Sequence, residues 1–391
     1  MANSSPFNSK LVSELGGSSI RDMFKRASGK TQSEVADMSL GAPYGSPPKS
    51  FSRTLVKLVK SNPSHSYMDN SGYYRIREVI AESLKANQLM PENLSAENVI
   101  VCAGSSGGLN CVLKSILNPG DEVLVLAPYF PDFGAYVENH GGMSIFVKLP
   151  APEFDPDVEI LARFLSPRTK ALIINTPNNP TGKVYSGDQI VKIHKWLAEA
   201  AKEVGHPIYL ISDETYRDIV FPDSGKEFVS SVRDYPDSVM VYSFSKSANV
   251  PGERIGYVVI NPGMDQRKTL SELVSLSQRK LGFTNAPALM QNMVPELLKI
   301  RPDVGDYQKK RDLISEALTK ARYVFNLPEG AFYFFVKYPM AEGQFLKLAQ
   351  EKGLFVVPGR AFGENDYFRI AFSRGIETVR LAARILKELG E

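Results

Sequence analysis

The 391-residue sequence contains only two cysteines, Cys102 and Cys111, which lie nine positions apart. With no second pair of cysteines, neither a disulfide framework nor a zinc cluster is expected, and the two thiols suit a reducing cytoplasm. The chain also lacks a strong charge of either sign, because its net charge is +3 and no block of like charges occurs. This balance argues against nucleic acid and against an acidic membrane surface as partners.

Long apolar runs are missing as well. No stretch of the sequence is long enough to span a bilayer. The first six residues, MANSSP, are polar and do not resemble a signal peptide. We therefore expect a cytoplasmic protein with no metal site and no membrane anchor.

What the sequence does contain is the composition of a globular protein with a sizeable core, with 43% hydrophobic and 23% charged residues. Between residues 99 and 259, short apolar runs alternate with longer amphipathic stretches. The runs are residues 99–102, 122–126, 171–174, 208–211, 239–242 and 256–259. Continuous apolar runs with helices between them predict an α/β fold with a mostly parallel sheet covered on both faces.

Both ends of the chain differ from this middle part. Residues 1–45 are polar and rich in Gly and Ser, and two aromatic runs, residues 330–336 and 368–372, look like antiparallel strands. We expect three parts: an N-terminal segment, residues 1–45, that joins a small domain; a large domain, residues 46–290; and the small C-terminal domain, residues 291–391.

The most informative segment is residues 242–256, where Lys246 stands among small hydroxyl residues and Arg254 follows eight positions later. A lysine in a pocket of low polarity loses its proton readily and can form a Schiff base with a carbonyl carbon. An arginine can hold a phosphate. Pyridoxal phosphate is an aldehyde that carries a phosphate. Residues 243–246 also fit the S-x-x-K pattern of serine acyl enzymes, but the partner motifs of that class do not follow downstream.

Small residues after the first apolar run suggest an anion site. Gly104, Ser105 and Ser106 open a predicted helix, so backbone N–H groups and the partial positive charge of the helix end are available to a phosphate. A tight turn between strand and helix is the alternative explanation. The stretch is neither a GxGxxG nor a GxxxxGK[ST] motif, which argues against dinucleotide and P-loop sites.

Four further residues follow, or lie in, apolar runs. Phe130 can stack on a flat ring, or it is a core aromatic beside a turn. Asn179, in a rigid Pro-rich loop, can donate to a phenolate-like oxygen, or the loop is only a turn. Asp213 can pair with a protonated pyridine nitrogen, or it caps a helix, and Tyr216 can point the same way. Arg369 can bind a substrate carboxylate in a planar fork, or it forms a salt bridge with a local acid.

Taken together, these motifs resemble those of the class I/II aminotransferases, which are pyridoxal-phosphate enzymes of fold type I. The resemblance extends from residues 39–43 to residues 368–370. Its order and spacing are specific: Asp213 lies 34 positions after Asn179, Lys246 lies 33 positions after Asp213, and Arg254 and Arg369 follow. The resemblance implies a seven-stranded, mostly parallel sheet between helices, with a smaller α+β domain built from both chain ends.

The resemblance also implies a role for each matching residue. Lys246 would hold pyridoxal 5'-phosphate as a Schiff base and then move a proton between the substrate Cα and the cofactor. Asp213 would pair with the pyridine N–H, while Asn179 and Tyr216 would bind the phenolic oxygen and Phe130 would stack on the ring. The remaining residues are implied by position: Gly104, Ser105, Ser106, Ser243 and Arg254 for the phosphate, Arg369, Asn179 and Gly41 for the substrate, and Tyr67, which would reach the neighbouring subunit's phosphate site in a homodimer.

The implied activity is transfer of an amino group from an L-amino acid, aspartate or another common one, to a 2-oxo acid such as 2-oxoglutarate, through aldimine and ketimine intermediates. Arg279, Lys280 and Arg360 are candidates for contact with the substrate side chain. A C–S lyase, a decarboxylase or a racemase on the same fold remains open. So does a non-enzymatic regulator, although the roughly 40 residues before Gly41 leave no room for the DNA-binding domain that such a protein needs.

Overall fold

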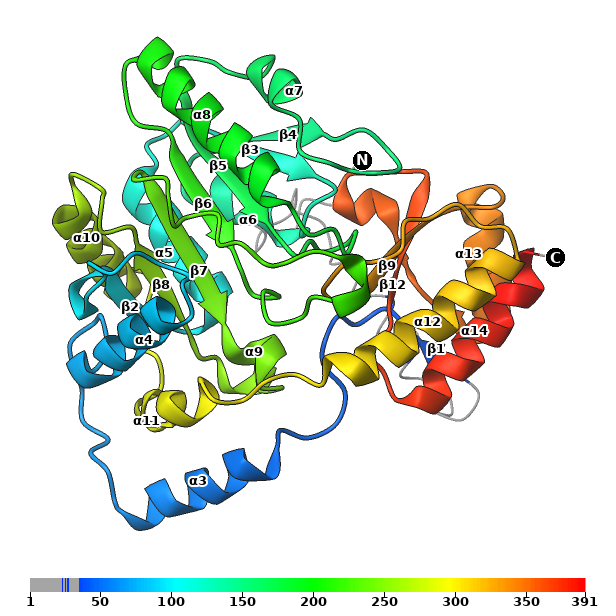
Figure 1. Ribbon diagram of the computed structural model, residues 1–391, viewed down its shortest axis with the longest axis horizontal. Coiled ribbons are helices and arrows are strands. Elements are labelled where there is room, and N and C mark those ends of the chain that lie inside the picture. Colours follow the sequence, from blue (N-terminus) through cyan, green and yellow to red (C-terminus); the bar gives the residue numbers. More distant parts are fainter. Residues whose placement is uncertain (1–22, 24, 26, 28–34, 391) are drawn as a thin grey trace, which may run out of the picture.

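A seven-stranded sheet lies at the centre of the computed structural model, which describes residues 23, 25, 27 and 35–390 (Figure 1). The strand order is β2-β8-β7-β6-β5-β3-β4. The strands are β2 (Val99–Cys102), β3 (Glu122–Ala127), β4 (Met143–Lys148), β5 (Thr169–Asn175), β6 (Tyr209–Asp213), β7 (Ser238–Ser243) and β8 (Gly256–Ile260). Only β8 pairs antiparallel with its two neighbours, so the other six strands share one direction. The predicted, mostly parallel sheet is confirmed.

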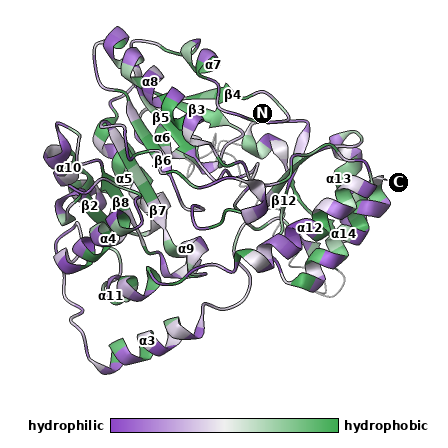
Figure 2. Cartoon of the chain, viewed as in Figure 1, coloured by the Kyte–Doolittle hydropathy of each residue, from purple (hydrophilic) through white to green (hydrophobic). Residues whose placement is uncertain are grey.

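The helices around this sheet cover both of its faces (Figure 1). They are α4 (Tyr74–Ala86), α5 (Gly104–Ile116), α6 (Asp132–Glu138), α7 (Val158–Ala162), α8 (Gly187–Val204), α9 (Phe244–Ser247), α10 (Arg267–Lys280) and α11 (Ala288–Leu297), with 3₁₀ turns at Ala96–Asn98, Pro222–Ser224 and Pro251–Glu253. Helix α3 (Lys49–Lys60) lies apart from the sheet and packs against α11 (Figure 1). Successive strand residues point to opposite faces. Val123 and Val125 pack toward α5, α6 and α10, whereas Leu124 and Leu126 pack toward α8. Both faces are thus dry over most of the sheet, which explains why the strands other than edge strand β4 are mainly apolar (Figure 2).

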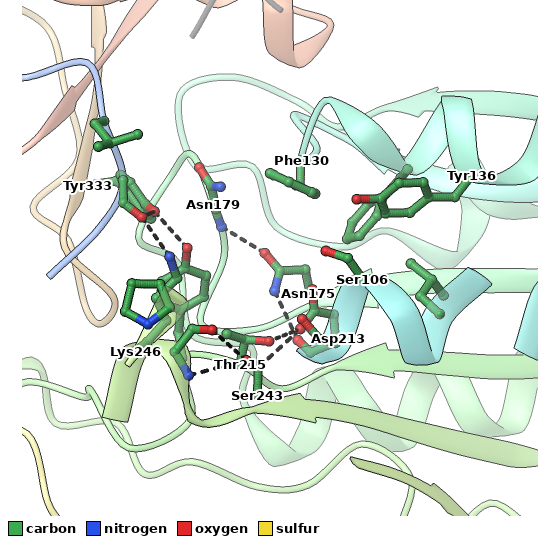
Figure 3. Close-up of a pocket in the computed structure, with 18 of the residues that line it drawn as sticks. Ser106, Phe130, Tyr136, Asn175, Asn179, Asp213, Thr215, Ser243, Lys246 and Tyr333 are labelled. Atoms are coloured by element: carbon green, nitrogen blue, oxygen red, sulfur yellow. Dashed lines mark hydrogen bonds between the residues drawn. The ribbon is translucent and has the colours of Figure 1, made fainter. Parts of the chain in front are cut away.

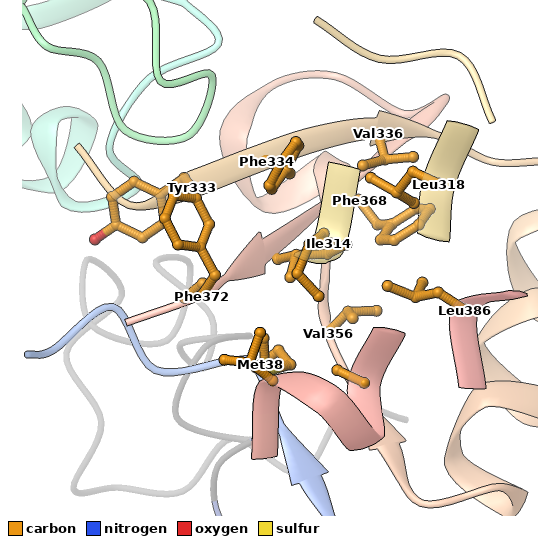
Figure 4. Packing of buried hydrophobic residues seen from close by; sticks show 14 of the residues in the cluster. Met38, Ile314, Leu318, Tyr333, Phe334, Val336, Val356, Phe368, Phe372 and Leu386 are labelled. Carbon is orange, nitrogen blue, oxygen red and sulfur yellow. The ribbon is translucent and has the colours of Figure 1, made fainter. Parts of the chain in front are cut away.

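A second group of elements lies beside the sheet. It contains a three-stranded antiparallel sheet in the order β11-β12-β9 and a parallel pair of β1 with β10. The elements are β1 (Ala36–Asp37), α12 (Val304–Lys320), β9 (Tyr333–Lys337), α13 (Glu342–Glu351), β10 (Leu354–Phe355), β11 (Val357–Pro358), a 3₁₀ turn at Gly359–Phe362, β12 (Tyr367–Ala371) and α14 (Ile376–Gly390). The antiparallel pairing of the two aromatic runs is as predicted, and their side chains pack with those of α12 and α14 (Figure 4). The boundaries at residues 45 and 290 stay a prediction.

Three further observations concern the cysteines, membrane spans and metal sites. Cys102 and Cys111 are buried free thiols. Among the described helices, none combines the length and the apolar character that a membrane span requires. No group of three or more His, Cys, Asp or Glu side chains within residues 35–390 is arranged to hold a metal ion.

Candidate active site

Polar side chains gather where the parallel strands end. Asn175 is the last residue of β5, Asp213 of β6 and Ser243 of β7, and α5 begins two residues after β2. Because parallel strands end at the same edge of a sheet, these groups lie around one cavity (Figure 3).

The cavity has a volume of about 220 Å³ and takes its walls from both parts of the molecule. Eleven of the residues predicted for the site line it: Gly41, Ser105, Ser106, Phe130, Asn179, Asp213, Tyr216, Ser243, Lys246, Arg254 and Arg369. Among the described residues, the charged lining consists of three cations, Lys246, Arg254 and Arg369, and one carboxylate, Asp213. A cavity with this excess of positive charge suits a ligand that carries both a phosphate and a carboxylate.

Lys246 lies on the short helix α9, which starts immediately after β7. The Ser243 hydroxyl caps this helix by accepting a hydrogen bond from the Ser245 amide at 3.2 Å. The Lys246 amine donates to the Gly41 carbonyl oxygen at 2.6 Å. Burial lowers the pKa of Lys246 from 10.5 to about 8, and the positive charge of Arg369 adds to this effect, while Asp213 opposes it. A fraction of the amine is therefore unprotonated near neutral pH and able to attack a carbonyl carbon.

Asp213 closes the opposite side of the cavity (Figure 3). No helix begins at Asp213, so the helix-cap alternative is wrong: its Oδ1 instead accepts hydrogen bonds from the Thr215 amide at 3.1 Å and from the Thr215 hydroxyl at 2.5 Å. Burial raises the pKa of Asp213, and the bonds from Thr215 oppose this rise. A buried carboxylate of this kind gains stability from a cationic partner, which a protonated ring nitrogen can provide.

Asn179 is held by its neighbours in the loop after β5. Its backbone amide donates to Asn175 Oδ1 at 2.8 Å, and its own Oδ1 accepts from Arg369 Nη1 at 2.9 Å. Asn175 in turn donates to the Asp213 carbonyl at 2.9 Å. Within the described residues the Asn179 NH₂ group has no hydrogen-bond acceptor, so it remains free to donate to an oxygen of a ligand.

Arg369 lies on β12 and is almost fully buried. Its guanidinium lies between the rings of Tyr333 and Phe362, with centroids 4.7 and 4.8 Å away, and it donates to the Ser39 carbonyl at 2.5 Å. No acidic side chain of residues 35–390 forms an ion pair with Arg369, so the salt-bridge alternative is wrong. Its buried Nε has no hydrogen-bond partner in the same part of the chain. An uncompensated buried cation with a free N–H fits a carboxylate ligand.

The N-terminus of α5 and Arg254 form the end of the cavity suited to a phosphate. Gly104 has a positive φ of +75°, and a Cβ there would lie 2.8 Å from Arg254 Nη2. Gly104 itself does not line the cavity, whereas the hydroxyl residues Ser105 and Ser106 do. On the facing side, the hydroxyls of Ser243 and Ser245 are 2.7 Å apart. A helix end, four hydroxyl groups and a guanidinium fit a phosphate group.

Several lining residues were not predicted from the sequence: Leu40, Leu109, Phe133, Tyr136, Asn175, Thr215, Ser245, Pro251 and Tyr333. Asn175 and Thr215 stood beside predicted residues and could have been found by their position at strand ends. Phe133 meets Phe130 edge to face, with ring centroids 5.5 Å apart, and so supports the predicted ring-stacking position. Nothing in the sequence marked Tyr333 as a site residue, because its run has the aromatic composition of a core strand.

Besides Gly104, four predicted residues lie outside this cavity. Tyr67 is 91% exposed, Arg279 and Lys280 are exposed at the end of α10, and Arg360 forms an ion pair with Glu342. None of these side chains lines the cavity of its own chain.

Comparison with known proteins gives a consistent picture. The family model for aminotransferase class I and II matches residues 33–386. A probable aspartate aminotransferase of Methanocaldococcus jannaschii is 29% identical, over 96% of this chain and 97% of the relative. An aspartate/prephenate aminotransferase of Thermus thermophilus is 31% identical, over 82% of this chain and 83% of the relative.

Solved structures agree with the sequence comparisons. An amino transferase from Eubacterium rectale superimposes with a TM-score of 0.92 at 30% identity, covering 98% of both chains. Aspartate aminotransferase from Thermus thermophilus with maleate gives a TM-score of 0.85 at 26% identity, covering 98% of this chain and 100% of that one. The predicted resemblance and the predicted fold type are confirmed.

Proposed function

Since the chain belongs to the class I and II aminotransferases and is a transaminase, we propose that it binds pyridoxal 5'-phosphate in the cavity around Lys246. The observation that carries the proposal is the arrangement of charge: Arg254 at the phosphate end, Asp213 and Lys246 on opposite sides, and Arg369 with a free N–H. When bound, pyridoxal phosphate supplies an aldehyde that condenses with amines and a protonated ring that withdraws electrons from the substrate Cα.

Each of the other roles in binding and proton transfer is assigned to a side chain of the cavity. The Lys246 amine holds the aldehyde carbon and later moves a proton to and from the substrate Cα, a role that contributes roughly 10²–10⁴-fold to rate. Asp213 keeps the ring nitrogen protonated, while the Asn179 NH₂ group and the Tyr216 hydroxyl orient the phenolic oxygen. Phe130 stacks on the ring, and Arg369 holds the α-carboxylate in a planar fork.

The proposed donors are aspartate or another common L-amino acid, and the proposed acceptor is a 2-oxo acid such as 2-oxoglutarate. The names of the relatives support aspartate as the donor. Within the described residues that line the cavity, the only cations are Lys246, Arg254 and Arg369, and each already has a proposed role. A second substrate carboxylate would therefore need a cation from elsewhere, such as Arg279 or Lys280 of a second subunit.

We also propose a homodimer that works in the cytoplasm and in which Tyr67 reaches the phosphate end of its neighbour's cavity. Three observations support this arrangement. Tyr67 is 91% exposed and does not line its own cavity. Helix α3 buries only Phe51 and leaves Val56 and Val59 more than half exposed, which is typical of an interface. Arg254 is itself exposed, so the phosphate end is accessible from outside.

The test is a spectrum followed by a half-reaction. Wild-type protein mixed with pyridoxal phosphate should give a visible absorption band that remains after gel filtration, and Lys246→Ala should not. Lys192→Ala, an exposed lysine on α8, is the matched control and should keep the band. Each common amino acid is then added in turn, and loss of the band marks a donor. A wild-type protein that stays colourless would overturn the proposal.

A further inference from the structure

Tyr333 links the hydrophobic core beside β9 to the candidate active site. Its ring is 1% exposed and packs against Phe332 with ring centroids 4.8 Å apart, as part of the cluster in Figure 4. Its hydroxyl lies at the margin of that cluster and lines the cavity that holds Lys246. Because the ring is packed in the core, the Tyr333 hydroxyl has little freedom to move relative to the cavity.

The Tyr333 hydroxyl belongs to a short chain of hydrogen bonds. It lies 2.6 Å from the Tyr216 hydroxyl and donates to the Gly41 carbonyl over a longer distance of 3.4 Å. The same carbonyl accepts from the Lys246 amine at 2.6 Å (Figure 3). A Cβ at position 41 would overlap the Tyr333 hydroxyl, so the glycine is what makes room for this chain.

Each tyrosine hydroxyl has one hydrogen to donate and can also accept. In the short Tyr216–Tyr333 bond either residue can be the donor. If Tyr216 gives its hydrogen to a ligand oxygen, the bond persists only when Tyr333 donates to Tyr216. Tyr333 then gives up its long bond to Gly41, which costs little. A hydroxyl that accepts a hydrogen bond becomes a stronger donor.

We propose that Tyr333 is a positioning residue for Tyr216: its hydroxyl orients the Tyr216 phenol and strengthens it as a donor to the phenolic oxygen of pyridoxal phosphate. This inference rests on the proposed function. Tyr333 also packs its ring against the Arg369 guanidinium at 4.7 Å. Tyr333→Phe removes only the hydroxyl and keeps this ring contact, so the variant separates the two contributions.

The test compares four proteins: wild type, Tyr333→Phe, Tyr216→Phe and the double variant. Two quantities are measured in each, the dissociation constant of pyridoxal phosphate, from quenching of intrinsic fluorescence, and the pH midpoint of the visible band. A weaker donor leaves more negative charge on the phenolic oxygen and so favours the protonated chromophore. We expect Tyr333→Phe to raise the midpoint by about half a unit, roughly a threefold change in proton affinity. The dissociation constant should rise roughly 2–10-fold.

The double variant decides whether the effect passes through Tyr216. In the Tyr216→Phe background, the further change Tyr333→Phe should alter neither quantity, because the bond that it removes is already absent. Tyr307→Phe is the control, since Tyr307 belongs to the same cluster and does not line the cavity. It should leave both quantities unchanged.

Each other outcome overturns the inference. Equal shifts in both backgrounds would mean that Tyr333 acts independently of Tyr216, and a Tyr333→Phe protein that matches wild type would mean that it has no such role. In both of these cases the wild-type band still forms and the proposed function stands. If the wild-type protein binds no pyridoxal phosphate, the proposed function and the inference fail together.

Discussion

Burial changes the ordinary chemistry of Lys246, and the cost of burying its charge can be measured without catalysis. The unfolded chain holds the Lys246 proton up to a pKa near 10.5, but the folded apoprotein holds it only up to about 8. The unfolded state therefore binds more protons between these values, so stability rises with pH over this window. Below pH 8 the full cost of the buried charge remains.

We expect Lys246→Met to make the apoprotein more stable than wild type by about 1–3 kcal/mol at pH 7. The advantage should shrink as pH rises from 8 toward 10.5, because the folded wild-type chain then holds Lys246 as the neutral amine and no longer carries the buried charge. Urea unfolding at pH 7 and pH 10 measures the difference, with Lys192→Met as the exposed control. An advantage that is the same at both pH values would contradict the assigned cause.

Asp213, a buried group of the opposite charge, should also lower the stability of the apoprotein while it serves the proposed function. Burial raises the pKa of Asp213, so its ionised form destabilises the folded apoprotein above the unfolded pKa near 3.8. We expect Asp213→Asn to raise the midpoint of urea unfolding of the apoprotein at pH 7. The same variant should lower kcat/KM about 100-fold or more, because an amide cannot keep a ring nitrogen protonated. Loss of both stability and activity would indicate a structural role instead.

At the residue scale, the sequence predicted the side chains that follow apolar strands, because the ends of parallel strands must meet. Lys246, Asp213 and Asn179 belong to this group. It could not predict Tyr333, since the hydroxyl partner of that residue, Tyr216, lies 117 positions away in the chain. Nor could the sequence show that Gly104 lies against the Arg254 guanidinium and does not line the cavity itself.

The helix α5 is the element on which the proposed phosphate site depends, and Gly104 makes its first turn possible. Gly104 has a φ of +75°, which costs a residue with a side chain about 1–2 kcal/mol, and a Cβ there would also press on Arg254. Gly120→Ala is a matched control, because Gly120 has a φ of +89° and open space around it. The two variants share the backbone strain and differ in the contact with arginine.

We expect Gly104→Ala and Gly120→Ala to lower the free energy of unfolding by a similar 1–2 kcal/mol in the apoprotein. Only Gly104→Ala should also weaken the binding of pyridoxal phosphate, because it displaces the Arg254 guanidinium. Fluorescence titration of both variants measures this difference. Equal affinities would show that the position of Arg254 does not depend on the glycine.

At the element scale, prediction succeeded for strands buried on both faces and failed for β4, at one edge of the sheet. Strands β5, β6 and β7 are continuous apolar runs because helices cover both of their faces. Edge strand β4 (sequence MSIFVK) buries only Val147 fully, so it carried no apolar run. The pairing of β1 with β10 joins residues more than 300 positions apart, a distance over which local pattern carries no information.

At the scale of the whole molecule, the fold leaves some of the proposed chemistry outside a single chain. The exposed Tyr67 and the exposed apolar side chains of α3 have no use in the cavity of their own chain. In the proposed homodimer, each cavity combines Lys246 of one chain with Tyr67 of the other. This arrangement predicts that two defective chains can complement each other, which a monomeric enzyme cannot do.

Two inactive or impaired variants should restore activity when their subunits mix. In a hybrid of Lys246→Ala with Tyr67→Ala chains, one cavity carries both defects and the other carries neither. Random exchange gives half of the dimers as hybrids, so we expect about a quarter of the cavities to be wild type and activity to approach a quarter of the wild-type value. The measurement is transaminase activity after mild unfolding and refolding of the two variants together, compared with refolding each alone. Refolding Lys246→Ala together with Asp213→Asn is the control, and it would restore a similar share of activity only if these two residues came from different chains. Because both line the cavity of one chain, every hybrid cavity there keeps one defect, and activity should stay at the level of the separate variants.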